Sequence, residues 1–236
     1  MNAHETRCKR WLVVVLFAIA MAWVEAAVVF YLRTMIDRIE PYQPYPLPIF
    51  GGLAAAELPR ELATLIMIFT VGWLAGKTRP SRLGYALITF GVWDIFYYIF
   101  LKVLTDWPHS LLDWDVLFLL PLPWWGPVLA PVCIAVLMIL WGTLVTQNET
   151  PERPFCAGGK AWALNLIGCV VALIVFMIDG IAVIGHGEHA LRNVLPTAFN
   201  WPVFGIAQLL MAAPIFEIAR QLRHRRSVPL ALTQTT

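Results

Sequence analysis

Six long runs of apolar residues, separated by short polar segments, dominate the pattern along the chain. A helix needs about 20 mostly apolar residues to cross the roughly 30 Å hydrocarbon layer of a bilayer. Each run is close to that length, so the pattern predicts six transmembrane helices. The predicted spans cover residues 11–32, 53–75, 83–104, 126–146, 161–185 and 201–219.

The second span carries a charged turn near its start, at Glu57, Pro59, Arg60 and Glu61. The uninterrupted apolar part that follows covers only residues 62–75. Because that part is short for a span, the charged turn either belongs to the membrane helix or forms a separate half-helix.

A further apolar run, residues 116–125, comes directly before the fourth span. Together the two are too long for one helix and too short for two. Pro121, Pro123 and Pro127 interrupt the run, and proline removes a backbone donor and clashes with the preceding turn. We therefore predict a re-entrant or interfacial segment, which a membrane tolerates only where the backbone is buried in protein or lines a wet cavity.

The composition strengthens the membrane interpretation. Of 236 residues, 59% are hydrophobic and only 14% are charged, with a mean hydropathy of +0.70. Soluble domains carry about 25% charged residues, so this chain is neither a soluble domain nor a disordered chain. We predict an all-α, polytopic membrane helix bundle that forms a single membrane domain over residues 1–236, with residues 227–236 as a disordered tail. The net charge of +2 gives no sign of a nucleic-acid partner.

The distribution of Lys and Arg predicts the orientation, because cytoplasmic loops are enriched in them. With six spans, twelve of the 17 basic residues lie on the side of both termini and four lie on the other, and Arg60 lies within a span. Both termini are therefore predicted to be cytoplasmic, in the inner membrane of a bacterium. The twelve are Arg7, Lys9, Arg10, Lys77, Arg79, Arg82, Arg153, Lys160, Arg220, Arg223, Arg225 and Arg226, and the four are Arg33, Arg38, Lys102 and Arg192.

Several ionisable residues fall inside the predicted spans, mostly in the half away from the termini. Such residues are costly in a membrane and indicate a functional site by default. On helices, Glu57, Arg60 and Glu61 share one face, and Asp94, Tyr97, Tyr98 and Lys102 form a second polar stripe. We therefore predict a polar binding pocket that opens toward the outer face. Its candidate binding residues are Glu25, Glu57, Arg60, Glu61, Asp94, Lys102 and Asp179.

The charges in this set are unbalanced, with five carboxylates against one arginine and one lysine. Carboxylates in a low-dielectric site cannot all stay ionised without partners. Either some are protonated, which indicates acid–base or proton-linked chemistry, or a cation occupies the site. The structural alternatives are that Glu57, Arg60 and Glu61 form an ion-pair cluster that fixes helix packing, and that Lys102 reaches the interface independently.

The cofactor cannot be named from the sequence, although a divalent cation would suit the acidic set. Asp179, His186 and His189 are candidate metal ligands, with solvated surface histidines as the alternative. Asp113 and Asp115 are expected to cap the segment that follows them, or else to line the mouth of the pocket. The histidines do not lie in the middle of a span, and nucleotide-binding glycine motifs are missing, so neither haem nor a nucleotide is expected.

Three functions remain open at this stage, and the sequence does not establish whether the chain is an enzyme. The first is a small transport protein linked to a cation or proton, with membrane lipids around it and an ion or small molecule as cargo. The second is a membrane enzyme that acts on a lipid or quinone with a carboxylate as general acid or base. The third is a structural or assembly subunit with a membrane-protein partner. Convergence of Glu25, Glu61, Asp94 and Asp179 would favour the first two.

Overall fold

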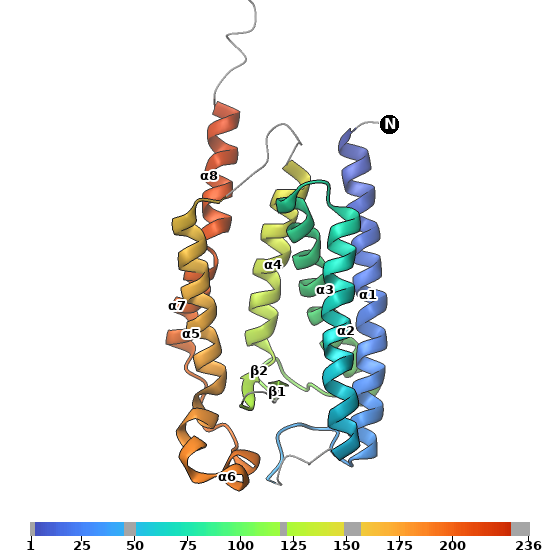
Figure 1. The fold of residues 1–236 in the computed structure, drawn as a ribbon, viewed down its shortest axis with the longest axis vertical. Coiled ribbons are helices and arrows are strands. Elements are labelled where there is room, and N and C mark those ends of the chain that lie inside the picture. Colours follow the sequence, from blue (N-terminus) through green and yellow to red (C-terminus); the bar gives the residue numbers. More distant parts are fainter. Residues whose placement is uncertain (1–2, 45–50, 119–121, 149–156, 228–236) are drawn as a thin grey trace, which may run out of the picture.

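The computed structural model describes residues 3–44, 51–118, 122–148 and 157–227. Helices dominate, and one short pair of strands lies between the third and fourth of them (Figure 1). The elements are α1 (Ala3–Met35), α2 (Gly51–Ala75), α3 (Arg79–Thr105), β1 (Trp114–Phe118), β2 (Trp124–Pro127), α4 (Leu129–Asn148), α5 (Gly159–Val183), the 3-10 turn η1 (Ile184–His186), α6 (Glu188–Asn193), α7 (Trp201–Met211) and α8 (Ala213–Ser227).

Six helical segments are long and apolar enough to cross a membrane, as predicted. The sixth is composed of α7 and α8, which are separated at Ala212. Pro214 explains the break, since it has no backbone N–H to donate to the preceding turn. The beginning of α1 and the end of α8 lie at the same end of the bundle, and β1, β2 and α6 lie toward the other, which we call the hairpin end (Figure 1).

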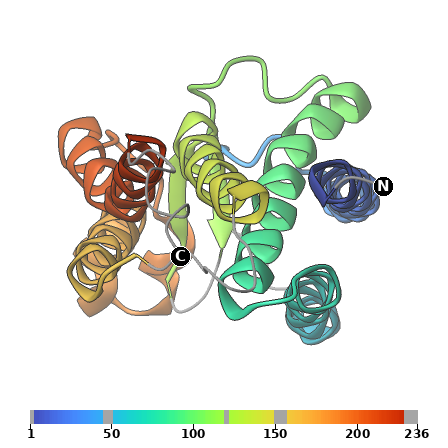
Figure 2. The same cartoon turned by 90° about the horizontal axis from the view of Figure 1, so that it is seen from above.

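The helices form two groups, which are clear in the view along the bundle (Figure 2). In the larger group, α3 packs against α1, α2 and α4; in the smaller group, α5 packs against α7 and α8. The groups meet where α4 contacts α7 and α8, and where β2 contacts α5. The larger group therefore holds the three helices that carry Glu25, Arg60 and Asp94.

Glycines allow α3 and α4 to lie close together. A Cβ atom added at Gly91 would lie 2.5 Å from the carbonyl oxygen of Ala135, and one at Gly142 would lie 2.4 Å from that of Gly84. Neither distance is compatible with a larger residue in this geometry. Small residues are typical of membrane helix interfaces, because they let backbones approach and gain van der Waals contact.

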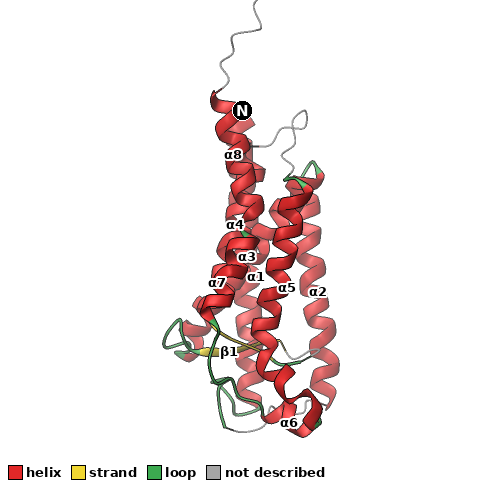
Figure 3. Ribbon diagram, turned by 90° about the vertical axis from the view of Figure 1, so that its left-hand side faces the viewer, coloured by secondary structure: helices red, strands yellow, loops and turns green. Residues whose placement is uncertain are grey.

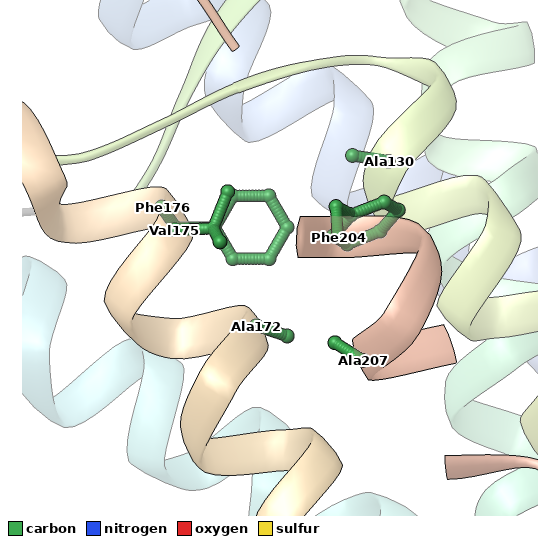
Figure 4. Packing of buried hydrophobic residues seen from close by; sticks show 6 residues of the cluster. All are labelled: Ala130, Ala172, Val175, Phe176, Phe204 and Ala207. Carbon is green, nitrogen blue, oxygen red and sulfur yellow. The ribbon is translucent and has the colours of Figure 1, made fainter. Parts of the chain in front are cut away.

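The two groups also share an apolar core near the hairpin. Phe176 on α5 and Phe204 on α7 lie with ring centroids 5.8 Å apart, and small residues surround them (Figure 4). Ala130 of α4 belongs to the same cluster. This core packs directly against β2, because a Cβ atom added at Gly126 would meet the Phe176 ring at 2.6 Å.

The strands were not predicted from the sequence. β1 and β2, drawn in yellow in Figure 3, are antiparallel, and Asp115 lies opposite Gly126 and Val116 opposite Trp125. The predicted fourth span, residues 126–146, began too early, because residues 124–127 form a strand and α4 begins at Leu129. β1 and β2 take up residues 116–118 and 124–125 of the apolar run for which we predicted a re-entrant or interfacial segment, and residues 119–121 lie outside the described part. The predicted tail, apart from Ser227 in α8, also lies outside it.

Candidate functional site

A buried ion pair links the end of α1 to the hairpin. The Nη2 atom of Arg33 lies 3.0 Å from Oδ1 of Asp115, and these side chains are 11% and 3% exposed. The hydroxyl of Tyr98 on α3 donates to the other carboxylate oxygen of Asp115 at 3.1 Å. One carboxylate thus joins α1, α3 and β1.

Two further contacts hold the Arg33 side chain. Its Nη1 atom donates to the carbonyl oxygen of Ile39 at 3.2 Å, and its guanidinium carbon lies 4.6 Å from the centroid of the Trp107 ring. Burial raises the pKa of the Asp115 carboxyl above its usual range, and the Arg33 guanidinium and the Tyr98 hydroxyl oppose that rise. A buried charge of this kind needs its partner, since an isolated one is very unfavourable.

A second ion pair connects α1 with α2. Arg60 on α2 donates a hydrogen bond to Oε2 of Glu25 on α1, and its other terminal nitrogen lies 4.0 Å from Glu61. The three side chains are 24%, 13% and 32% exposed, respectively. The charged turn predicted from the sequence is therefore part of the continuous helix α2 and contacts α1.

Asp94 lies on α3 one turn before Tyr98. Its Oδ2 atom is buried and has no hydrogen-bond partner among the described residues. Asp94 is within electrostatic reach of Asp115, and the Tyr97 side chain is within reach of Arg33, Glu25 and Asp94 together. We call Glu25, Arg33, Arg60, Glu61, Asp94, Tyr98 and Asp115 the polar cluster.

The polar cluster has an excess of negative charge. It contains the four carboxylates of Glu25, Glu61, Asp94 and Asp115 and two guanidiniums. If every group were ionised, two negative charges would stay uncompensated within the cluster. A proton or a bound cation would relieve that excess, and Asp94 is the carboxylate whose buried oxygen lacks a partner.

The structure does not bring every predicted site residue into this cluster. Lys102 is at the last turn of α3, where its Nζ atom lies 2.7 Å from Oδ1 of Asp106 and holds the pKa of that carboxyl below its usual range. Asp179 is on α5, in the smaller group of helices, and Thr197 hydrogen-bonds to it. The side chain of Glu57 lies outside those that the structure describes.

The predicted metal ligands Asp179, His186 and His189 do not form a metal-binding group in the described part of the structure. Within residues 3–44, 51–118, 122–148 and 157–227, no group of three or more His, Cys, Asp or Glu side chains could hold a metal ion. His186 is exposed in η1, and His189 contacts Asn193 one turn further along α6. These residues offer no metal centre in the arrangement described.

The most buried part of the site, the pair of Arg33 and Asp115, was not predicted from the sequence. Arg33 was assigned to the orientation signal, whereas it is 9% exposed and pairs with Asp115. Asp113 does cap the turn before β1, since it accepts hydrogen bonds from the backbone of His109 and Ser110. Tyr98 belonged to the predicted polar stripe of α3, and this stripe was the one feature of the sequence that pointed to the buried group around Asp115.

Comparison of the chain with protein-family models, with curated proteins and with solved structures found no match. The six apolar helices make this a multi-pass membrane protein in contact with lipid. Any more specific function has to be argued from the polar cluster itself.

Proposed function

We propose that this membrane protein moves a proton or a small cation across the bilayer, and that Asp94 is the group that binds it. The observation that carries the proposal is the buried Oδ2 atom of Asp94, which has no hydrogen-bond partner among the described residues. A protein keeps an ionisable group in such a place at a cost in stability, and function is the usual reason.

The surroundings of Asp94 support a proton or cation as the ligand. The nearby arginines already engage other carboxylates, Arg33 with Asp115 and Arg60 with Glu25. An anionic substrate would therefore compete with these pairs and meet the remaining negative charge. A cation or proton would instead lower the energy of a carboxylate that is close to Asp115.

We also propose that both termini are cytoplasmic, so that the polar cluster lies toward the outer half of the membrane. Twelve of the 17 basic residues fall on the side of the termini. The N-terminal end of α1 and the C-terminal end of α8 lie at the same end of the bundle, which supports an even number of crossings (Figure 1). The inner membrane of a bacterium would fit this arrangement.

The test is a flux measurement with purified protein in liposomes that contain a pH-sensitive dye. A potassium diffusion potential or a sodium gradient would drive the ion, and the internal pH would be recorded. We expect the wild-type protein to move protons or to couple them to the cation, and Asp94→Asn to reduce the rate at least about tenfold. Asp106→Asn is the matched control, because it makes the same change at an exposed carboxylate that ends the same helix.

Two results would contradict the proposal. One is an Asp94→Asn protein that transports at the wild-type rate. The other is a wild-type protein that, although folded and correctly inserted, moves neither protons nor alkali cations under either gradient. Thermal unfolding of each variant in detergent would establish that a loss of flux is not a loss of fold.

A further inference from the structure

A separate pocket lies at the hairpin end, outside the polar cluster. Its volume is about 230 Å³, and it lies between the segment that follows α1 and the segment that joins α3 to β1. We propose that it binds a small organic ammonium ion, such as one with a quaternary nitrogen. The residues that carry the argument are Glu40, Tyr42, Trp107, His109, Asp113 and Trp114.

Two partly exposed aromatic rings line the pocket, and each is supported by a neighbour. The Tyr42 ring packs edge-on against Trp125 at 6.4 Å between centroids, and the Trp114 ring packs against Phe199 at 6.1 Å. Trp107 also borders the pocket, but it is 3% exposed and the Arg33 guanidinium lies over its ring, so it acts as a fixed wall and not as a cation-binding face. Aromatic faces attract cations, and cages of such rings are the usual binding site for quaternary ammonium groups.

Two carboxylates give the pocket a negative charge. Asp113 is held in place by hydrogen bonds from the backbone N–H groups of His109 and Ser110, at 2.7 and 3.2 Å. Glu40 lies 3.3 Å from Nε2 of His109, and both side chains are more than half exposed. An exposed pair of this kind is weak, so a cation could replace the histidine as the partner of Glu40.

No lining Lys or Arg offsets the negative charge of Glu40 and Asp113, since none of the described residues that line the pocket is of either type. Arg33 lies against the Trp107 ring but is paired with Asp115. Arg38 keeps its positive charge, because the Pro41 carbonyl oxygen that accepts from two of its nitrogens, at 3.1 and 2.8 Å, is neutral, but its side chain does not line the pocket.

These Arg38 contacts also shape the pocket. They close a tight loop after α1 and so fix the chain on either side of Pro41, where Glu40 and Tyr42 stand. The site is thus assembled from a braced loop and from the capped turn at Asp113. Pre-organisation of this kind lowers the entropic cost of binding.

The size and composition of the pocket limit the ligand. A volume of about 230 Å³ is below the range of about 300–1,000 Å³ that holds drug-sized molecules. A bare metal ion would prefer a cage of oxygen or nitrogen ligands to aromatic walls. A methylated ammonium ion suits both the aromatic walls and the two carboxylates, since it is apolar on its surface and carries one positive charge.

Direct binding to the purified protein in detergent tests the inference, with tetramethylammonium as the probe. Isothermal titration or tryptophan fluorescence would follow saturation. We expect saturable binding of tetramethylammonium and none of a neutral carbon analogue of the same shape. Tyr42→Leu should weaken binding about three- to tenfold, and Tyr42→Phe should retain it because the ring remains.

Glu40→Gln should weaken binding about two- to fivefold through the loss of charge. Glu5→Gln is the matched control, because Glu5 is an exposed carboxylate at the opposite end of the bundle. Equal binding of the neutral analogue, no saturable binding, or unchanged affinity in both Tyr42→Leu and Glu40→Gln would overturn the inference. The inference does not depend on the proposed function, since neither Tyr42 nor Glu40 belongs to the polar cluster and the assay measures binding rather than flux.

Discussion

Arg33 at the end of α1 and Asp115 in β1 form a buried ion pair with an N···O distance of 3.0 Å. The two residues are 82 positions apart in the chain. The pair ties β1 to α1, and the Tyr98 hydroxyl that bonds to the same carboxylate adds α3. Asp115 therefore belongs both to the hairpin and to the polar cluster.

Removal of either partner should destabilise the protein strongly. Arg33→Leu or Asp115→Leu would leave an uncompensated buried charge, which costs about 3–5 kcal/mol. The double variant should recover much of that loss. Thermal unfolding in detergent would measure it, with the exposed pair Glu5–Lys9 as the control, where Glu5→Gln should cost less than about 0.5 kcal/mol. Equal small effects at both pairs would contradict the structural importance of Asp115.

The Tyr98 hydroxyl should contribute a smaller amount through its bond to Asp115. Tyr98→Phe removes a buried donor at 3.1 Å without changing the shape of the ring. We expect a loss of about 1–2 kcal/mol in the free energy of unfolding. Tyr97→Phe is the adjacent control, and it should have less effect because the structure shows no hydrogen bond from the Tyr97 hydroxyl to a described residue. A larger loss at Tyr97 would disprove this assignment.

The sequence predicted most of the helical fold because each span has to be apolar along its whole length. The start of the fourth span was misplaced because a strand covers Gly126, and the break at Pro214 inside the sixth span was not predicted. Periodicity placed Asp94, Tyr98 and Lys102 on one stripe of α3; in the structure Tyr98 bonds to Asp115, whereas Lys102 pairs with Asp106 at the end of the helix. It could not reveal the partnership of Arg33 with Asp115, because an arginine just beyond a span has the same appearance whether it points into the protein or into water.

The close approach of α3 and α4 should not tolerate a larger residue. Gly91→Val would place a Cβ atom only 2.5 Å from the carbonyl oxygen of Ala135, which is too close for two non-bonded atoms. Overpacking of this kind typically costs about 1–3 kcal/mol. The control is Gly159→Ala at the start of α5, where an added Cβ has nothing within 4 Å. Thermal unfolding that ranks Gly159→Ala as the more damaging change would refute the observed packing.

Replacement of Asp94 should change the stability of the protein and its ion flux in opposite directions. The buried Oδ2 atom of Asp94 is without a hydrogen-bond partner among the described residues, so replacement by an apolar residue of similar size should remove a desolvation cost of about 1–3 kcal/mol. We therefore expect Asp94→Leu to unfold at a higher temperature than the wild type while it loses ion flux. Such a gain in stability with a loss of activity is typical of residues kept for function. If Asp94→Leu instead unfolded at a lower temperature, Asp94 would be a structural member of the polar cluster, and the transport proposal would lose the observation that carries it.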